Sequence, residues 1–127
     1  MKKLLILLFS LLISFNSYGE WSLITTSEDG DSFYIDIESI TDKNGYVYFW
    51  ELVDYKKPLL DVAYSSKNFI EADCTLHSYK YLSDTYFTEP MGKGSIYSSS
   101  NIADKDWRYN APGSSGVSIL TRVCFKH

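Results

Sequence analysis

Histidine is scarce in this chain, which has only His77 and His127 among its 127 residues. A hydrolase with a serine or cysteine nucleophile normally needs a histidine base, and no G-x-S-x-G motif surrounds any serine here. We expect His77 to lie on a strand, and His127 is the last residue. We therefore predict that the protein is not an enzyme.

Basic residues are also few, with 12 Lys and Arg against 16 Asp and Glu and a net charge of −4. No cluster of basic residues interrupts this balance, so a phosphate backbone would be repelled and nucleic acid is excluded as a partner.

Asp29-Gly30-Asp31 resembles the start of a calcium loop, but Ile40 occupies the twelfth position, where an EF-hand needs glutamate. We predict no metal and no cofactor.

The only long apolar run lies at the N-terminus. Residues 1–3 are a short basic start, residues 4–13 are apolar except for Ser10, and small residues stand at Ser17 and Gly19. This is the layout of a secretory signal peptide, and the run is shorter than the roughly 20 residues of a membrane span. We predict cleavage after Gly19, leaving a single exported domain at 20–127 that does not span a membrane. No cysteine lies beside the cleavage site, so we expect no lipid anchor.

Cysteine is limited to Cys74 and Cys124. In an oxidising compartment, an even pair of cysteines indicates a disulfide. Two cysteines cannot supply the four ligands of a structural zinc site, and neither histidine stands at finger-like spacing. The pair also lacks the C-x-x-C spacing that is usual for redox chemistry. We therefore predict one structural disulfide.

Aromatic residues are abundant, at 17% of the chain, and they favour strands. Glycine-containing turns at 28–31 and 43–45 separate the first predicted strands, and one helical turn capped by Asp36 lies between them. We expect Lys56-Lys57-Pro58 to end the third strand, because proline cannot donate to a ladder. The predicted strands are 21–26, 32–36, 46–54, 63–74, 77–87 and 95–99.

The segment 46–54 carries the strongest strand pattern, and apolar residues on both of its faces indicate a central strand. Glu51 interrupts one of these faces. Burial there would raise the pKa of Glu51 and allow a functional acid. We favour the alternative, an edge or interface carboxylate that pairs with a lysine or arginine.

The last segment changes from strand to helix pattern. Ser114 or Ser115 can cap a helix that runs to about Phe125. Its apolar face carries Cys124, which places this cysteine to bond Cys74 on the sheet. We predict an α+β fold, with an antiparallel β-sheet of about five to six strands and a C-terminal helix packed on it and tied by a disulfide.

The best candidate partner-binding residues are Trp107, Arg108 and Tyr109, in a polar loop at 101–113, with Tyr97 nearby. Aromatic and arginine side chains are enriched at interface hot spots because they bury much area at low entropic cost. The alternative is that Trp107 folds back onto the sheet.

An ordered set of short motifs runs along the whole of 20–127. The motifs are Trp21, Tyr34-Ile35-Asp36, Ser39-Ile40, Tyr46 to Leu52, Lys56-Lys57-Pro58, Tyr64-Ser65-Ser66-Lys67, Asp73-Cys74, Met91-Gly92-Lys93-Gly94, Trp107, Pro112-Gly113-Ser114 and Val123-Cys124. This set resembles the surface-adhesin protein E family of exported bacterial proteins. The resemblance implies an antiparallel sheet whose C-terminal helix is tied by a Cys74–Cys124 disulfide. It also implies a non-enzymatic binding role, adhesion to host matrix or serum proteins such as laminin and vitronectin.

Two functions from different classes follow. The first is an exported binding protein, a bacterial surface adhesin for host matrix or serum proteins. The alternative is a periplasmic accessory or inhibitor protein that binds an envelope or host enzyme. Both place the protein in the periplasm or at the cell surface of a Gram-negative bacterium, and a homodimer through the sheet is a further expectation.

Overall fold

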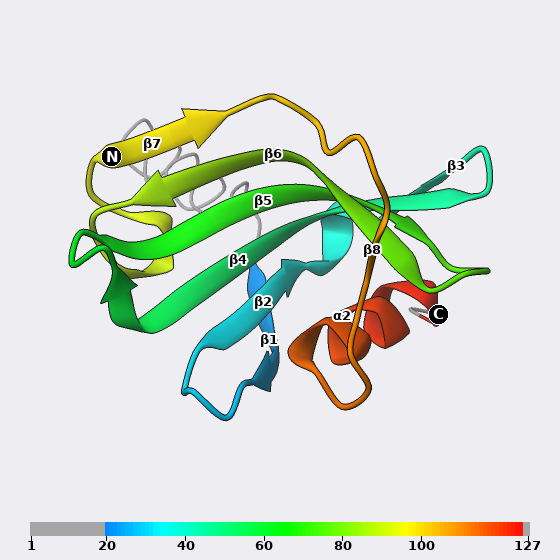
Figure 1. Cartoon of the computed structure of the whole chain (residues 1–127), viewed down its shortest axis with the longest axis horizontal. Coiled ribbons are helices and arrows are strands. Elements are labelled where there is room, and N and C mark those ends of the chain that lie inside the picture. The colour runs from blue at the N-terminus through cyan, green and yellow to red at the C-terminus, as the bar shows by residue number, and fades with distance from the viewer. Residues whose placement is uncertain (1–19, 126–127) are drawn as a thin grey trace, which may run out of the picture.

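A curved antiparallel sheet and one α-helix make up most of the computed structural model, which describes residues 20–125 (Figure 1). The predicted signal peptide, at 1–19, lies outside the described residues. The sheet has eight strands, so the expectation of five to six is wrong, whereas the α+β class is confirmed. The strands are β1 Trp21–Thr26, β2 Ser32–Asp36, β3 Thr41–Lys43, β4 Tyr46–Leu59, β5 Ala63–Asp73, β6 Ser78–Phe87, β7 Ile96–Ser100 and β8 Arg108–Tyr109.

The strand order is β1-β2-β4-β5-β6-β7, with β3 paired to β4 and β8 paired to β6. A short 3₁₀ turn, η1 (Ile37–Ser39), follows β2, and Asp36 caps it by accepting a hydrogen bond from the Glu38 backbone N–H. A second turn, η2 (Pro90–Gly92), connects β6 to β7. Strand β4 is flanked by β2 and β5, which confirms the central position predicted for 46–54.

The two extra strands carry little sequence signal. All three residues of β3 are exposed and polar, so no apolar alternation marks them. The tight turn into β4 uses positive φ angles at Asn44 (54°) and Gly45 (85°), as the sequence indicates. Strand β8 has only two residues, and it lies inside the segment that we predicted to be a loop.

Strand β4 does not end at the lysine pair before Pro58 but continues to Leu59. Its register with β5 is irregular between Asp54 and Leu59, and Pro58 has no partner residue in that stretch. A proline is tolerated there because no ladder hydrogen bond is required of it. The predicted stop is therefore wrong.

His77 lies in the turn between β5 and β6 and not on a strand, so that prediction is also wrong. Its φ of 56° is in the left-handed region, which the turn requires and which a strand residue would not adopt.

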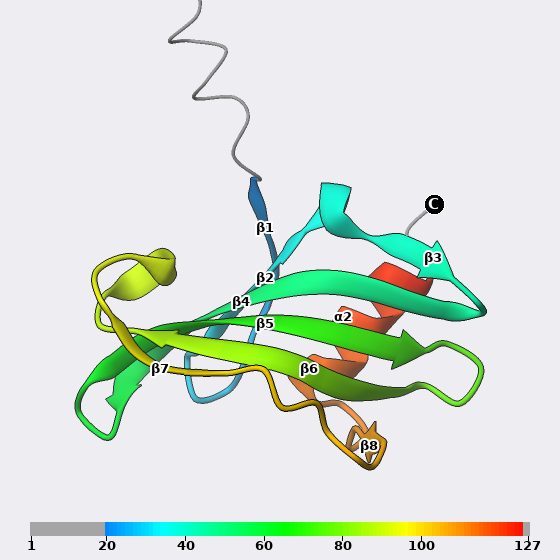
Figure 2. The same ribbon diagram turned by 90° about the horizontal axis from the view of Figure 1, so that it is seen from above.

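Helix α2 (Ser115–Cys124) lies against one face of the sheet, beside β1, β2 and β4 (Figures 1 and 2). Its buried side chains are Ile119, Leu120 and Val123, which join the main apolar core. Ser114, one of the two predicted caps, is the N-cap, although its side chain makes no capping hydrogen bond. Within residues 20–125, no helix is long and apolar enough to cross a membrane. The other buried residues of this core are Ile35, Val47, Phe49, Ile70 and Ala72.

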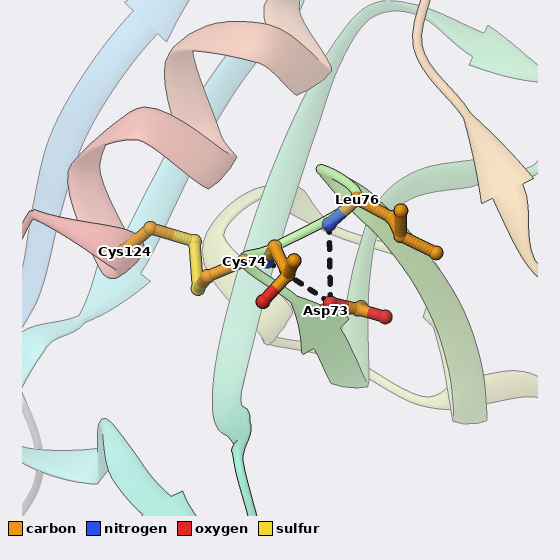
Figure 3. The surroundings of a disulfide bond; sticks show 5 residues. Asp73, Cys74, Leu76 and Cys124 are labelled. Atoms are coloured by element: carbon orange, nitrogen blue, oxygen red, sulfur yellow. Dashed lines mark hydrogen bonds between the residues drawn. A yellow bond between two sulfur atoms is a disulfide. The ribbon is translucent and has the colours of Figure 1, made fainter.

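The predicted disulfide between Cys74 and Cys124 is confirmed, with the two Cα atoms 5.6 Å apart (Figure 3). Cys74 follows β5 directly, and the Asp73 carboxylate fixes the turn there by accepting hydrogen bonds from the backbone N–H groups of Thr75 and Leu76. The disulfide therefore ties the last turn of α2 to the end of a central strand.

Candidate functional site

Aromatic side chains line the face of the sheet that points away from α2. Successive strand residues point to opposite faces, so Val47 and Phe49 pack in the core while their neighbours on β4 point to the other side. There the rings contact one another across β4 and β5: Trp50 is tilted against Phe69 at 4.9 Å between centroids, and Tyr48 stacks on Phe69 at 6.2 Å. We call this surface the aromatic face; it consists of Tyr46, Tyr48, Trp50, Phe69 and Trp107.

Trp107 lies on this face, half-buried, rather than standing free in its loop. Its ring stacks on Tyr46 with centroids 5.5 Å apart, and the Lys80 ammonium lies 4.8 Å from the same ring. A cation over an indole contributes about 0.5–1 kcal/mol at an exposed site. Trp107 therefore folds back onto the sheet and adds its ring to the aromatic face.

Arg108 fixes the loop to the sheet. Its guanidinium donates to both carboxylate oxygens of Asp104, at 2.7 and 3.1 Å, and lies 4.8 Å from the centre of the Tyr81 ring. The hydrogen bond from Arg108 lowers the pKa of Asp104. Asp104 also accepts a hydrogen bond from the backbone N–H of Tyr81. Arg108 thus has a structural role that its sequence context does not reveal.

Tyr109 and Tyr97 lie at opposite ends of β6. Tyr109 is 67% exposed and pairs with Ser78, whereas Tyr97 is 47% exposed on β7, next to the residue that pairs with Tyr86. Figure 1 shows the strands β8 and β7, which carry these residues, apart from each other along β6. The structure therefore places Trp107 on the aromatic face, Arg108 over Tyr81 and Tyr109 at an exposed position of β8, and it places Tyr97 apart from all three.

A cavity of about 360 Å³ lies on the other side of the sheet, between β4, β6 and the connection from β8 to α2. Among the described residues that line it, the acidic side chain is Glu51, which is only 4% exposed. Asn68 Nδ2 donates to Glu51 Oε1 at 3.0 Å, and burial raises the pKa of Glu51 to about 7. No lysine or arginine pairs with this carboxylate within residues 20–125, so our preferred interpretation of Glu51 is wrong.

A second hollow of about 330 Å³ adjoins the first, because Phe33 and Tyr81 line both. It contains Arg108, and the Tyr55 hydroxyl lies 2.8 Å from Ser66 Oγ at its wall. Burial raises the pKa of Tyr55 to about 12, so this phenol stays neutral. In the described part of the chain, no three histidine, cysteine or acidic side chains gather as a metal site would require.

These features define a class of protein: an α+β domain in which a single helix covers one face of a curved antiparallel sheet and aromatic rings line the other. Residues 21–125 match the family model described as Surface-adhesin protein E, and the chain belongs to that family. A family of adhesins fits a non-enzymatic role.

Solved structures share the fold. "The structure of Haemophilus influenzae protein E" matches with a TM-score of 0.64 at 18% identity, over 84% of each chain. Crystal form II of the same Haemophilus influenzae protein matches with a TM-score of 0.61 at 20% identity, over 74% of this chain and 80% of that one. No curated protein sequence matches the chain.

Proposed function

We propose that the protein is an exported surface adhesin of a Gram-negative bacterium and that it binds a protein partner through the aromatic face. The observation that carries this proposal is an aromatic surface that the fold leaves uncovered: Trp50 is 38% exposed although it sits on the central strand of the sheet. Family membership supports the adhesin role.

The chemistry of the face suits a protein partner. Aromatic rings bury large areas at low conformational cost, and a rigid strand holds them in place before binding. Lys80 lies over Trp107, and Lys67 lies 5.9 Å from the Trp21 ring and 5.4 Å from the Phe87 ring. Lysines beside aromatic rings favour a partner surface that is apolar with acidic groups around it.

Host matrix and serum proteins are the proposed partners, so immobilised laminin and vitronectin are the probes. Trp107→Ala and Trp50→Ala should each weaken binding by about tenfold, a loss of roughly 1.4 kcal/mol, which would place both among the minority of interface residues that cost more than about 1 kcal/mol when truncated. Tyr64→Ala is the matched control, because Tyr64 has the same 38% exposure as Trp50 but lies outside the aromatic face. Tyr97→Ala tests whether the partner reaches the other end of β6.

Equal binding by the wild type and both tryptophan variants would exclude the aromatic face as the contact surface. Protease shaving of intact cells separates the two functional classes: loss of the protein supports the adhesin, whereas protection until the outer membrane is opened supports the periplasmic accessory role. The homodimer through the sheet stays a prediction, and light scattering of the purified protein would measure it.

A further inference from the structure

The cavity between the sheet and α2 has the make-up of a small-molecule site. Its volume of about 360 Å³ lies in the range of ligand pockets, which are mostly apolar with a few placed polar groups. Two of its walls, Tyr79 and Tyr81, stand edge-on with ring centroids 5.7 Å apart and planes at 90°. Rings in this arrangement form two sides of an aromatic cage, and the other aromatic members of the wall are Phe33, Phe49 and Tyr109.

Among residues 20–125, Glu51 is the charged side chain that lines this cavity, and no salt bridge joins it to a cationic side chain. Asn68 supplies one hydrogen bond to Oε1, and Arg108, which lines the adjoining hollow, is bonded to Asp104 instead. A buried carboxylate without a cationic partner destabilises a fold, and an apolar residue at this position would remove that cost. The arrangement leaves the position of a cation open beside Glu51.

Two further polar groups in the same wall lack partners. Asn110 Nδ2 and Ser114 Oγ are buried, and neither makes a hydrogen bond within the described chain. The Asn110 amide lies against the first turn of α2, in space that a side chain at position 116 would fill but Gly116 leaves free. A donor and a hydroxyl therefore line the cavity with unused hydrogen-bonding capacity.

We propose that this cavity binds a small organic amine, with its ammonium group paired to Glu51, its body packed against the Tyr79 and Tyr81 rings where they line the cavity, and an oxygen acceptor satisfied by Asn110 and Ser114. Aromatic rings with an adjacent carboxylate attract organic cations through both the ring quadrupole and the charge. This ligand site is independent of the aromatic face, which lies on the other side of the sheet.

The proposal predicts tighter binding at alkaline than at acidic pH. The titratable groups that interact electrostatically with Glu51 are the phenols of Tyr55, Tyr79 and Tyr81, whose pKa values burial raises above the ordinary value of 10.0. The charged groups beside Tyr81 are Arg108 and Asp104, which pair with each other. The three phenols stay neutral near pH 8, as Asn68 does at any pH. Loss of affinity on acidification therefore reports protonation of Glu51 itself.

Calorimetry on the purified exported protein near pH 8 tests the proposal with three matched probes: tyramine, its neutral isostere tyrosol, and the anion 3-(4-hydroxyphenyl)propanoate. We expect tyramine to bind at least about tenfold more tightly than tyrosol, and the anion not to bind. Glu51→Gln keeps the side-chain shape and should abolish the preference for tyramine. Glu71→Gln is the control, since Glu71 lies on the neighbouring strand and bonds Tyr48 on the opposite face.

Tyr109→Ala gives a second test that spares the fold, because Tyr109 is 67% exposed at the edge of the cavity. It should weaken tyramine binding several-fold. The proposal is overturned if no probe binds, if tyrosol binds as tightly as tyramine, or if Glu51→Gln leaves the tyramine affinity unchanged.

Discussion

Asn68 donates a hydrogen bond of 3.0 Å to Glu51, and the two residues face each other directly across β4 and β5. Both are buried, at 5% and 4% exposure, at the centre of the sheet. The amide stabilises the carboxylate, but burial outweighs this contribution and the pKa of Glu51 rises to about 7. Glu51 therefore changes its charge close to physiological pH.

Stability should fall as the pH rises from about 4.5 to about 7. In that window the folded protein holds a proton on Glu51 that the unfolded chain, with its ordinary pKa of 4.5, has released. The free energy of unfolding therefore decreases with pH, by up to about 3 kcal/mol once both states are ionised. Urea denaturation near pH 5 and near pH 8 measures the difference.

Glu51→Gln should remove this pH dependence and stabilise the protein near pH 8, because an amide is neutral at both values. Glu71→Gln should keep the wild-type slope. A wild-type protein that is as stable near pH 8 as Glu51→Gln would contradict the buried, unpaired carboxylate.

A third buried polar residue, Ser65, fixes the η2 turn to the sheet. Its hydroxyl donates to the Glu89 carbonyl at 2.6 Å and accepts from the Gly92 backbone N–H at 2.8 Å, and the side chain is fully buried. Ser65→Ala should lower the free energy of unfolding by about 2–3 kcal/mol, because both backbone groups lose their partner. Chemical denaturation measures this loss, with the exposed Ser98→Ala as control. A loss below about 0.5 kcal/mol, the range of neutral surface changes, would show that water replaces the hydroxyl.

The sequence could predict elements whose signal is local. The hairpin at Asn44-Gly45 and the cap at Asp36 depend on residue types that tolerate or stabilise one backbone geometry, and both are present. Strand β3 and strand β8 are too short and too exposed to carry a periodic pattern, so their pairing depends on neighbours that are distant in sequence. Pro58 was misleading because the register of β4 with β5 is irregular at this point, so no ladder hydrogen bond is required of the proline. The sequence does not reveal this irregularity.

In the candidate site, too, the sequence reveals local features but not those that depend on the tertiary structure. The aromatic character of Trp107 and Tyr109 was evident, but only the tertiary structure places the first on Tyr46 and the second beside the cavity. The burial of Glu51 depends on β5, β6 and α2 closing around β4, so its apolar sequence neighbours gave only a hint. The one signal in the sequence for this burial was the position of a carboxylate inside a strong strand pattern.

The mature N-terminus is predicted to be Glu20. Ser17 and Gly19 are the small residues that a signal peptidase requires before the cleavage site. Intact-mass measurement of the protein purified from the exported fraction should give the mass of residues 20–127 with one disulfide. A mass that retains residues 1–19 would contradict cleavage.

The final prediction concerns the covalent tie between Cys74 and Cys124, which lie 50 residues apart in sequence. Closing a loop of this length restricts the unfolded chain and stabilises the fold by roughly 4 kcal/mol in the chain-entropy description. That is a large share of the free energy of unfolding of a typical small domain, which is about 5–15 kcal/mol in total. The Cys74→Ser, Cys124→Ser double variant should therefore unfold at a much lower urea concentration.

The helix and the sheet should nevertheless unfold together in that variant. Leu120 and Val123 are buried in the same core as Phe49, so α2 cannot leave without exposing the centre of the sheet. Far-ultraviolet circular dichroism and tryptophan fluorescence should report one coincident transition. The reduced wild-type protein, as the matched control, should show the same midpoint. Proteolysis confined to residues 110–125 while the sheet stays folded would instead show that the disulfide, and not the apolar packing of α2, holds the helix on the sheet.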